Sequence, residues 1–509
     1  MSLTVPVTTI VAQNHNKLLG AHSTWCRVPL NQVATVLNGF AFSSARFNQD
    51  TGTPLLRIRD VLRGRTDSYY DGPFEPQYLV QPGALVVGMD GDFNASRWRG
   101  PAAVLNQRVC KIDPDERYYD LRFLSYVLPG YLDAINAETS AITVKHLSSR
   151  TVGEIPLPLP PLPEQHRIVA AIEEQFTRLD AAVASLGRAR ANLKRYRAAV
   201  LAAACSGRLI QDEAESTPTE GNEYNTAAAL VAQIVSEQAS TVTKKNVMAQ
   251  QENEEILPDL PRDWVWASVA QLASAEQNAI TDGPFGSNLK TSHYTASGPR
   301  VIRLQNIGDG AFVDAEAHIS EEHYQSLRKH HVAPGDIVIA ALGETLPRAC
   351  VIPSSVGPAI VKADCVRFRP HRHVAPQFLN YALNAKSTRE RTSAIIHGVG
   401  RPRLNLGEIK SIMLPVAPPD TQHRIVAEVE RRLSIVDDME ASVAASLKRA
   451  GRLRQAVLRR AFAGELVPQD PSHEPASALL ERIRAERATT TTQGSTRRRT
   501  RRVPQPPLR

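Results

Sequence analysis

The sequence predicts an α+β fold in which two mixed α/β domains are separated by two long antiparallel helices. Three observations support this prediction. The chain has 509 residues, of which 42% are apolar and 22% charged, so it is globular and too long for one core. Residues 155–209 align without a gap on residues 412–466, with 22 identities in 55 positions. Both aligned segments carry the apolar pattern of a long helix, so we expect an internal duplication with pseudo-two-fold symmetry.

The first repeated segment has apolar residues at every seventh position and others between them. They are Ile172, Leu179, Leu186, Leu193 and Val200, with Phe176, Val183 and Ala204 at the alternate positions. Gly207 and Gly464 stand where C-terminal caps belong, which gives helices of about 40 residues, or roughly 60 Å. Charged residues such as Arg197 and Glu440 interrupt the apolar seams, so the two helices are expected to pack on each other as a coiled-coil spacer. Two unrelated coiled coils that recruit other chains remain the alternative.

The domains follow from these helices and from changes in composition. We expect a flexible N-terminus at 1–22, a mixed domain at 23–155, a helix at 156–212, a polar connector with a short helix at 213–258, a second mixed domain at 259–412, a second long helix at 413–471, a short helix at 472–488 and a disordered basic tail at 489–509. The two mixed domains, domain 1 (23–155) and domain 2 (259–412), contain diverged counterparts. PLLRIRDV at 54–61 matches PRVIRLQNI at 299–307, and PGALVVGMDGD at 82–92 matches PGDIVIAALGE at 334–344.

The net charge of +8 is concentrated at the C-terminus, where residues 489–509 hold six arginines and no acidic residue. Overall basicity is therefore a poor argument for nucleic-acid binding. The five cysteines form no CxxC pair, and no apolar run is long enough for a membrane span, so a cytoplasmic protein is expected. We find no Walker A, GxSxG, HExxH or methyltransferase tetrapeptide, and no His cluster with the ligand spacing of a metal site.

Several motifs resemble one family, the specificity subunits of type I restriction-modification systems. They are GFAFSSARF at 39–47, YLVQPGALVVGMDGDFN at 78–94, LNQRV at 105–109, DGPFGSNLK at 282–290 and QHRIV at 165–169 and 422–426. The resemblance covers about residues 23–488 and implies two target-recognition domains, each reading half of a split site in duplex DNA. It implies no catalysis and no cofactor on this chain. Methyltransferase subunits, two in number, would bring S-adenosylmethionine, and restriction subunits would bring ATP and Mg²⁺, in a system of phage defence.

Candidate site residues follow from residue type and from the resemblance. In the Gly-rich segment 282–290 the backbone can approach a phosphate, although a tight turn at the domain edge explains it equally well. The candidates for phosphate contact are Arg97, Arg99, Lys145, His146, Ser287, Lys290, Arg401 and Arg403, and those for base contact are Asn94, Asn288 and Arg348. The repeated helix starts give candidates for docking partner subunits, namely Gln165, His166, Arg167, Gln422, His423 and Arg424. For each residue a surface charge or a structural hydrogen bond is the alternative.

Two other functional classes compete with this interpretation. A fused restriction enzyme would carry its own methylation or cleavage motifs, which the sequence lacks. A coiled-coil adaptor that never touches DNA would need only the long helices.

Overall fold

The computed structural model describes residues 5–139, 145–210, 226–241, 257–398 and 400–499. The chain divides into two compact units, which we describe separately. Unit 1 comprises Met1–Leu186 with Ala445–Arg509, and unit 2 comprises Gly187–Ala444. The long helices α6 (Leu162–Cys205) and α12 (Pro419–Phe462) each contribute one end to each unit. Both have 44 residues, close to the expected length of about 40. The segments expected to be helical from 156 and from 413 each begin instead with a strand, at Pro156–Leu159 and Met413–Val416, because their prolines precede the helix start.

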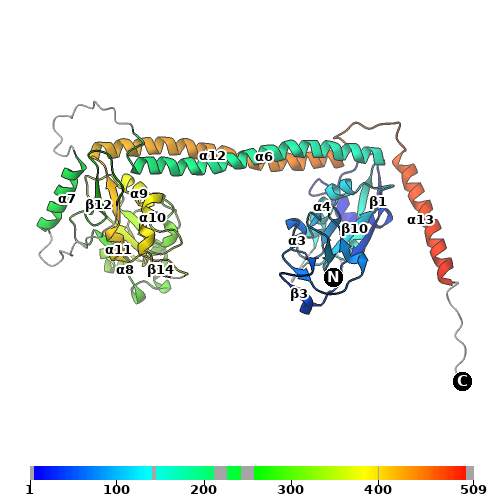
Figure 1. Cartoon of the computed structure of the whole chain (residues 1–509), viewed down its shortest axis with the longest axis horizontal. Helices are drawn as coiled ribbons and strands as arrows, with labels where there is room; N and C mark the ends of the chain where they lie inside the picture. Colours follow the sequence, from blue (N-terminus) through cyan, green and yellow to red (C-terminus); the bar gives the residue numbers. More distant parts are fainter. Residues whose placement is uncertain (1–4, 140–144, 211–225, 242–256, 399, 500–509) are drawn as a thin grey trace, which may run out of the picture. The chain divides into compact units, whose positions relative to one another are not determined.

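Unit 1 contains domain 1 and the helices around it (Figure 1). Its strands are β1 (Cys26–Pro29), β2 (Ala34–Asn38), β3 (Phe47–Asn48), β4 (Thr53–Leu56), β5 (Tyr69–Tyr70), β6 (Leu79–Val80), β7 (Leu85–Gly88), β8 (Ala95–Arg97), β9 (Ala103–Leu105), β10 (Val109–Pro114) and β11 (Pro156–Leu159). Its shorter helices are α1 (Val7–Gln13), α2 (Leu30–Val33), α3 (Asp60–Arg63), α4 (Leu121–Glu138), α5 (Ser149–Gly153) and α13 (Ala476–Arg499).

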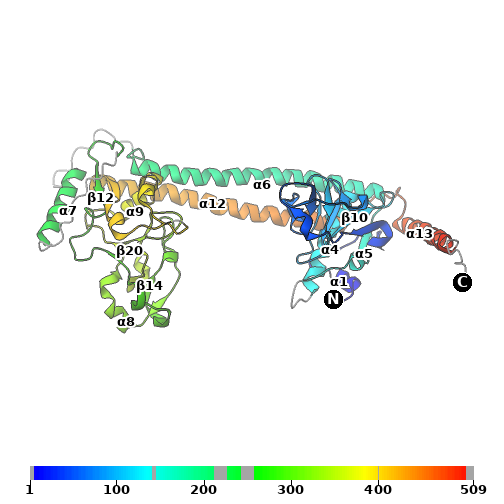
Figure 2. The ribbon, with the colours of Figure 1, turned by 60° about the horizontal axis from the view of Figure 1, so that its bottom comes forward.

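Unit 2 contains domain 2, in which β14 and α8 lie on the side away from α12 (Figure 2). Its strands are β12 (Val265–Ser268), β13 (Ile280–Asp282), β14 (Tyr294–Ile302), β15 (His318–Ile319), β16 (His331–Val332), β17 (Ile337–Ala340), β18 (Arg348–Val351), β19 (Ala359–Val361), β20 (Cys365–Phe368) and β21 (Met413–Val416). Its shorter helices are α7 (Ala227–Thr241), α8 (Glu321–Ser326), α9 (Pro376–Asn384), α10 (Lys386–Thr392) and α11 (Leu406–Ser411).

The two domains have sheets of the same strand order. The order β2-β10-β7-β8 in domain 1 corresponds to β13-β20-β17-β18 in domain 2, and β5-β4-β9-β6 corresponds to β15-β14-β19-β16. Directions agree as well, since β4–β9 and β14–β19 are the parallel pairs within otherwise antiparallel sheets. β7 and β17 are the buried strands expected after the Pro-Gly turns, because every residue in both is buried.

The strand registers give a residue-by-residue correspondence between the domains. Leu56 pairs with Leu105 as Ile302 pairs with Val361, so Arg57 corresponds to Arg303 and Asp60 to Asn306. Both correspondences have the same local geometry. The backbone N–H of Arg57 donates to Asp60 Oδ2 at 3.0 Å, and that of Arg303 donates to Asn306 Oδ1 at 2.9 Å. Asp60 and Asn306 are each fully buried, so each locks a tight turn after the strand.

Within each unit, the start of one long helix shares a core with the end of the other. In unit 1, Ile168 and Ile172 of α6 are buried in one cluster with Phe462 of α12. In unit 2, Val200 of α6 is buried in one cluster with Val429 of α12. Burial of these apolar side chains fixes both helix ends to their domains.

Charged residues of the helix seams pair across the helices inside each unit. In unit 1, Arg454 of α12 lies 3.2 Å from Asp180 of α6 and 4.2 Å above the ring of Phe176. In unit 2, Arg197 of α6 pairs with Asp437 and Glu440 of α12. The apolar seam weakens along unit 1, because Val183 is 39% exposed instead of buried as the heptad pattern predicts.

The structure differs from the sequence-based prediction at both ends of the chain. Residues 1–22 were expected to be flexible, but α1 is helical and buries Val7, Ile10 and Val11 in the unit 1 core, because its apolar residues share one face. The short helix expected to end at 488 is α13, which runs to Arg499, since no proline lies between 476 and 503. Residues 500–509 of the predicted basic tail, and 211–225 and 242–256 of the connector, lie outside the described residues.

In each domain one glycine packs against the backbone of a turn between two other strands, and we call it the crossing glycine. A Cβ on Gly39 would lie 2.0 Å from the carbonyl oxygen of Asn106, and one on Gly283 would lie 2.1 Å from the carbonyl carbon of Lys362. These glycines correspond, because each directly follows the edge strand that pairs with β10 or β20. We therefore expect Gly39→Ala to destabilise domain 1 by about 1–3 kcal/mol or more, measured as a lower thermal unfolding midpoint.

The matched control for this change is Gly187→Ala in the interior of α6. A Cβ on Gly187 meets no atom within 4 Å, and alanine favours the helix. This variant should unfold at the same temperature as the wild-type chain or slightly higher. An unchanged midpoint for Gly39→Ala would contradict the close approach.

Candidate nucleic-acid interface

Each domain carries an exposed aromatic residue one or two positions after the crossing glycine. Phe40 follows Gly39 and is 49% exposed, and Phe285 follows Gly283 by two residues and is 51% exposed. The backbone of Phe40 is fixed on both sides, because its N–H donates to Leu105 O at 2.9 Å and its carbonyl accepts from Gln107 N at 2.8 Å. The turn after the glycine therefore presents an apolar ring to solvent from a fixed backbone.

Domain 2 contains a cavity of about 530 Å³ beside this turn. Its lining residues are Thr291, Tyr294, Arg303, Leu304, Gln305, Leu342, Lys362, Ala363, Asp364 and Arg401. Three of them carry a positive charge and one a negative charge. The Lys362 ammonium lies 5.7 Å from the centre of the Tyr294 ring, and Asp364 pairs with Arg403. The lining therefore carries a net positive charge, which suits an anionic polymer.

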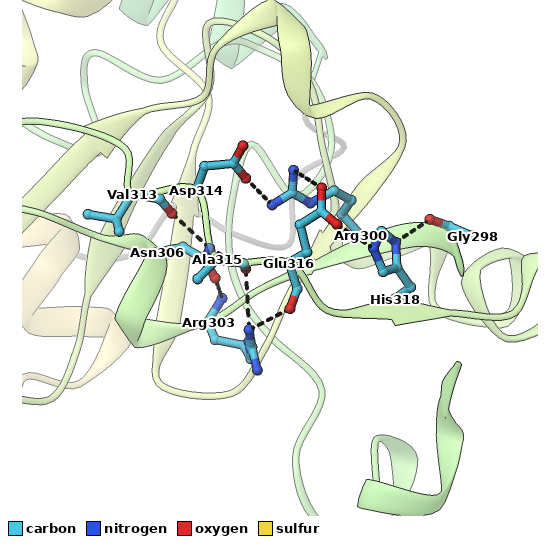
Figure 3. A network of polar contacts seen from close by, with 9 residues as sticks. All are labelled: Gly298, Arg300, Arg303, Asn306, Val313, Asp314, Ala315, Glu316 and His318. Carbon is cyan, nitrogen blue, oxygen red and sulfur yellow. Dashed lines mark hydrogen bonds and ion pairs between the residues drawn. The ribbon is translucent and has the colours of Figure 1, made fainter. Parts of the chain in front are cut away.

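The side chain of Arg303, a residue of the cavity lining, is held by a polar network (Figure 3). Its Nη2 donates to the carbonyl oxygens of Ala315 at 3.3 Å and Glu316 at 3.1 Å. Asn306 donates through Nδ2 to Val313 O at 3.0 Å and to Ala315 O at 2.8 Å, so it fastens the same segment. The turn formed by Leu304–Asn306 is thus rigid, and its middle residue, Gln305, is exposed.

Two polar atoms that line or border this cavity lack a protein partner. The Tyr294 hydroxyl and Nε of Arg303 are buried, and neither makes a hydrogen bond within the part of the chain that the structure describes. Buried polar groups are normally hydrogen-bonded, so two such atoms in residues of one cavity lining are unusual.

The candidates in the Gly-rich segment lie on the surface and lead into the cavity. Ser287, Asn288 and Lys290 are exposed, and the carbonyl of Asn288 accepts from the His323 ring at 2.9 Å. The next residues of the segment, Thr291 and Tyr294, line the cavity. The predicted phosphate-contact segment thus leads along the chain to residues of the cavity lining.

The remaining candidates in domain 2 have different surroundings. Arg401 is exposed and lines the cavity. Arg403 is engaged by Asp364, and Arg348 donates to Leu304 O at 3.3 Å behind the rigid turn. Arg401 is therefore the one of these three cations that both is exposed and lines the cavity.

In domain 1 most candidates are tied to the domain itself. Lys145 Nζ donates to Asn136 O at 2.6 Å, and His146 lies 2.6 Å from Asp90 Oδ1. Arg97 and Arg99 donate to the carbonyl oxygens of Gly83 at 3.3 Å and Leu62 at 3.2 Å. Asn94 is half-buried beside β7. These contacts hold the loops around β7 and β8 in place.

The sequence-based candidates do not include two residues that the structure places in the cavity lining. Gln305 and Lys362 line the cavity of domain 2, and their counterparts in domain 1 are Arg59 and Asn106. The signal that could have found them is the match between 54–61 and 299–307, which aligns Arg57 with Arg303 and Arg59 with Gln305.

At the starts of the long helices, the candidates for partner docking separate into buried and exposed residues. Gln165 and Gln422 are fully buried. Gln165 accepts from the N–H of Asp120 at 2.8 Å and donates to the carbonyls of Tyr118 and Pro160, both at 2.9 Å. Gln422 accepts from the N–H of Ala375 at 2.9 Å and donates to Ala417 O at 2.8 Å. Both glutamines therefore fasten a helix start to its domain.

The neighbours of these glutamines face outward. His166, His423 and Arg424 are exposed, and Arg167 is half-buried. The exposed histidines and Arg424 are thus accessible to another chain.

Comparisons with known proteins agree with this architecture. Residues 22–183 match the family model described as type I restriction modification DNA specificity domain. The chain is 36% identical over 492 residues to the Escherichia coli type I restriction enzyme EcoBI specificity subunit, covering 94% of this chain and 96% of that one. It is 26% identical to the E. coli EcoDI specificity subunit, over 80% of this chain and 84% of that one.

A solved structure also matches in fold. It comes from a study of complex assembly and conformational transition of the type I R-M system, with a TM-score of 0.59 and 18% identity, over 87% of this chain and 98% of that chain. Taken together, the matches define a DNA specificity protein of restriction-modification systems. The chain belongs to the family of type I restriction enzyme specificity subunits, as its motifs indicated. Such subunits are non-catalytic, so the chain is not itself an enzyme. Among the described residues, no helix combines the length and apolarity needed to cross a bilayer.

The buried glutamines give a testable prediction. Gln165→Leu leaves one N–H and two carbonyl groups without partners in a buried place, so it should lower the free energy of unfolding by about 2 kcal/mol or more. Gln422→Leu should act in the same direction. Thermal unfolding of each variant measures the effect. His423→Ala, at an exposed position next to Gln422, is the control and should change stability by less than about 0.5 kcal/mol. Equal midpoints for all variants would contradict the structural role of the glutamines.

A buried histidine fixes the beginning of the Gly-rich segment. His330 is 5% exposed, and its Nδ1 lies 2.6 Å from the carbonyl oxygen of Asp282. Burial lowers the pKa of His330 below its usual value, and burial lowers the pKa of His331 as well. Unfolding therefore allows these rings to take up protons at a higher pH than the folded protein does.

The stability of unit 2 should consequently decrease on acidification. The contribution of neutral His330 is complete above a pH of about 6.5 and is lost as the pH falls below that value toward the lowered pKa. His330→Gln retains a neutral N–H donor and does not titrate. Its denaturant midpoint should fall less between pH 7 and pH 5 than that of the wild-type chain, and the midpoint of the double variant with His331→Gln should fall less still. Identical slopes in all three chains would contradict this assignment.

Proposed function

We propose that this chain reads a bipartite site in duplex DNA, one half-site with each domain, and addresses a type I restriction-modification complex to that site. One observation carries the proposal. Two domains of the same strand order and register present different side chains at corresponding positions, such as Arg59 and Gln305. A shared scaffold with different surface residues suits two reading surfaces for two different half-sites.

We propose further that the two halves arose by duplication and are related by pseudo-two-fold symmetry, with α6 and α12 as an antiparallel coiled-coil spacer. A 44-residue helix is about 66 Å long, enough to span half-sites on successive major-groove faces about 34–36 Å apart. The length of the helices would then set the number of unread base pairs between the half-sites.

The partners in this proposal are two methyltransferase subunits and, in the full complex, restriction subunits. We place the methyltransferase contacts at the repeated helix starts, where His166, His423 and Arg424 are exposed. S-adenosylmethionine, ATP and Mg²⁺ would be bound by those partners, and this chain would bind no cofactor. A coiled-coil adaptor that never touches DNA is the competing function. It predicts that the complex binds all duplexes equally in an electrophoretic mobility assay.

An exchange of domains tests the proposal directly. Residues 23–155 are replaced by the corresponding segment of the E. coli EcoBI specificity subunit, and the chain is expressed with its own methyltransferase subunits. Genome-wide mapping of methylated bases should show one half-site changed and the other half-site and the spacer length retained. The complementary exchange of 259–412 should change only the other half-site. A methylated motif that is the same in both exchanges and in the wild-type complex would overturn the two-domain assignment.

A further inference from the structure

On the proposed reading surface, some corresponding positions hold the same residue in both domains and others hold different residues. The crossing glycine is shared, as Gly39 and Gly283, and so is the arginine that directly follows the strand, as Arg57 and Arg303. The same hydrogen bond closes the turn in both domains. Asp60 and Asn306 have side chains of the same shape, and each accepts from the backbone N–H of the arginine. Two residues after the shared arginine, the domains differ, because domain 1 has Arg59 and domain 2 has Gln305.

The differing residue lies on a turn whose backbone is held by side-chain hydrogen bonds. Gln305 directly precedes buried Asn306, whose side chain makes hydrogen bonds to Arg303, Val313 and Ala315. Arg59 directly precedes buried Asp60, and its own side chain is 55% exposed. Its guanidinium is oriented by Ser68, to whose Oγ Nη2 donates at 3.0 Å, and by Asp60 Oδ1 at 3.9 Å from Nε, so that the remaining donors face outward. A side chain on a backbone fixed in this way meets a ligand in a defined place, which is what discrimination between similar ligands requires.

The surroundings of Gln305 fit one edge of a DNA duplex. Lys362 and Arg401, which line the same cavity, supply positive charge for phosphates, and Arg401 is exposed. The Tyr294 hydroxyl and Nε of Arg303 are buried without a protein partner among the described residues. Phe285 follows Gly283, the glycine that packs against Lys362, and its ring is exposed. An apolar face of this kind can contact a thymine methyl group.

We propose that Gln305 and Arg59 are corresponding base-reading residues, each of which specifies one base pair of its own half-site. The proposal rests on the DNA-reading function given above and deepens it. Glutamine pairs in a bidentate manner with adenine N6 and N7, whereas arginine pairs with guanine O6 and N7. Gln305 therefore reads an A·T pair in the half-site of domain 2, and Arg59 reads a G·C pair in the half-site of domain 1. Asn306 and Asp60 are positioning residues, because they act through the turn.

The test uses the full chain in complex with its methyltransferase subunits. Four chains are compared, namely wild type, Gln305→Arg, Arg59→Gln and the control Gln325→Arg. The control makes the same chemical change on α8, at an exposed glutamine outside the cavity lining. The readout is the methylated motif across a genome, together with relative methylation rates on duplexes that differ at single base pairs.

Gln305→Arg should change the preference at one base pair of one half-site from A·T toward G·C by about tenfold to a hundredfold and leave the other half-site unchanged. Arg59→Gln should change one base pair of the opposite half-site from G·C toward A·T. Gln325→Arg should keep the wild-type motif. Because each change alters a single half-site, a general loss of folding cannot imitate it.

Two results would overturn the inference. One is a Gln305→Arg complex that methylates the wild-type motif with unchanged relative rates, and the other is a change that affects both half-sites equally. If Gln305→Arg gives an inactive complex, Gln305→Ala decides: relaxed preference at one base pair supports the inference, and an unchanged preference overturns it. Failure of the proposed function is recognised separately, because the wild-type complex would then methylate or bind DNA without any motif.

Discussion

Everything in this structure depends on the burial of one polar side chain at each junction between a domain and a long helix. Gln165 and Gln422 are fully buried, and each satisfies backbone groups of its domain and of its own helix start. A flexible hinge at these points would need no such contacts. The buried amide fixes the start of the helix against its domain, because moving the helix would leave several buried polar groups unpaired. The surfaces proposed to read DNA are useful only because each domain is held in this way.

The sequence predicted the long helices well, because a heptad pattern and a repeated glycine cap are local signals that tertiary contacts reinforce. It also predicted the buried strands after the Pro-Gly turns at β7 and β17. It failed where the property depends on partners far away in the chain. The type of residue 165 suggests an exposed amide, and only the approach of Tyr118 shows that it is buried. Val183 fits the seam by spacing, yet it remains 39% exposed.

The candidate site was harder to predict for the same reason. Arg97 and Arg99 were predicted by residue type to contact phosphate, and only the structure shows that each also donates to a carbonyl of its own domain. Gln305 has no distinguishing local pattern. Its correspondence to Arg59 appears only when the registers of β14–β19 and β4–β9 are compared, and its place in the cavity lining appears only in the structure. Such a surface is defined by which residues strand pairing brings together, and the type of each residue along the chain does not reveal this.

The short ladders at the base of the domains have a consequence for evolution. β1 pairs with β11 and β12 with β21 in antiparallel register, so the chain enters and leaves each domain through adjacent strands. A segment whose two ends lie side by side can be replaced by a homologous one without moving the helices that follow. Recombination between related genes can therefore exchange a whole domain as a cassette, and a new DNA target can arise in one event rather than through many separate substitutions.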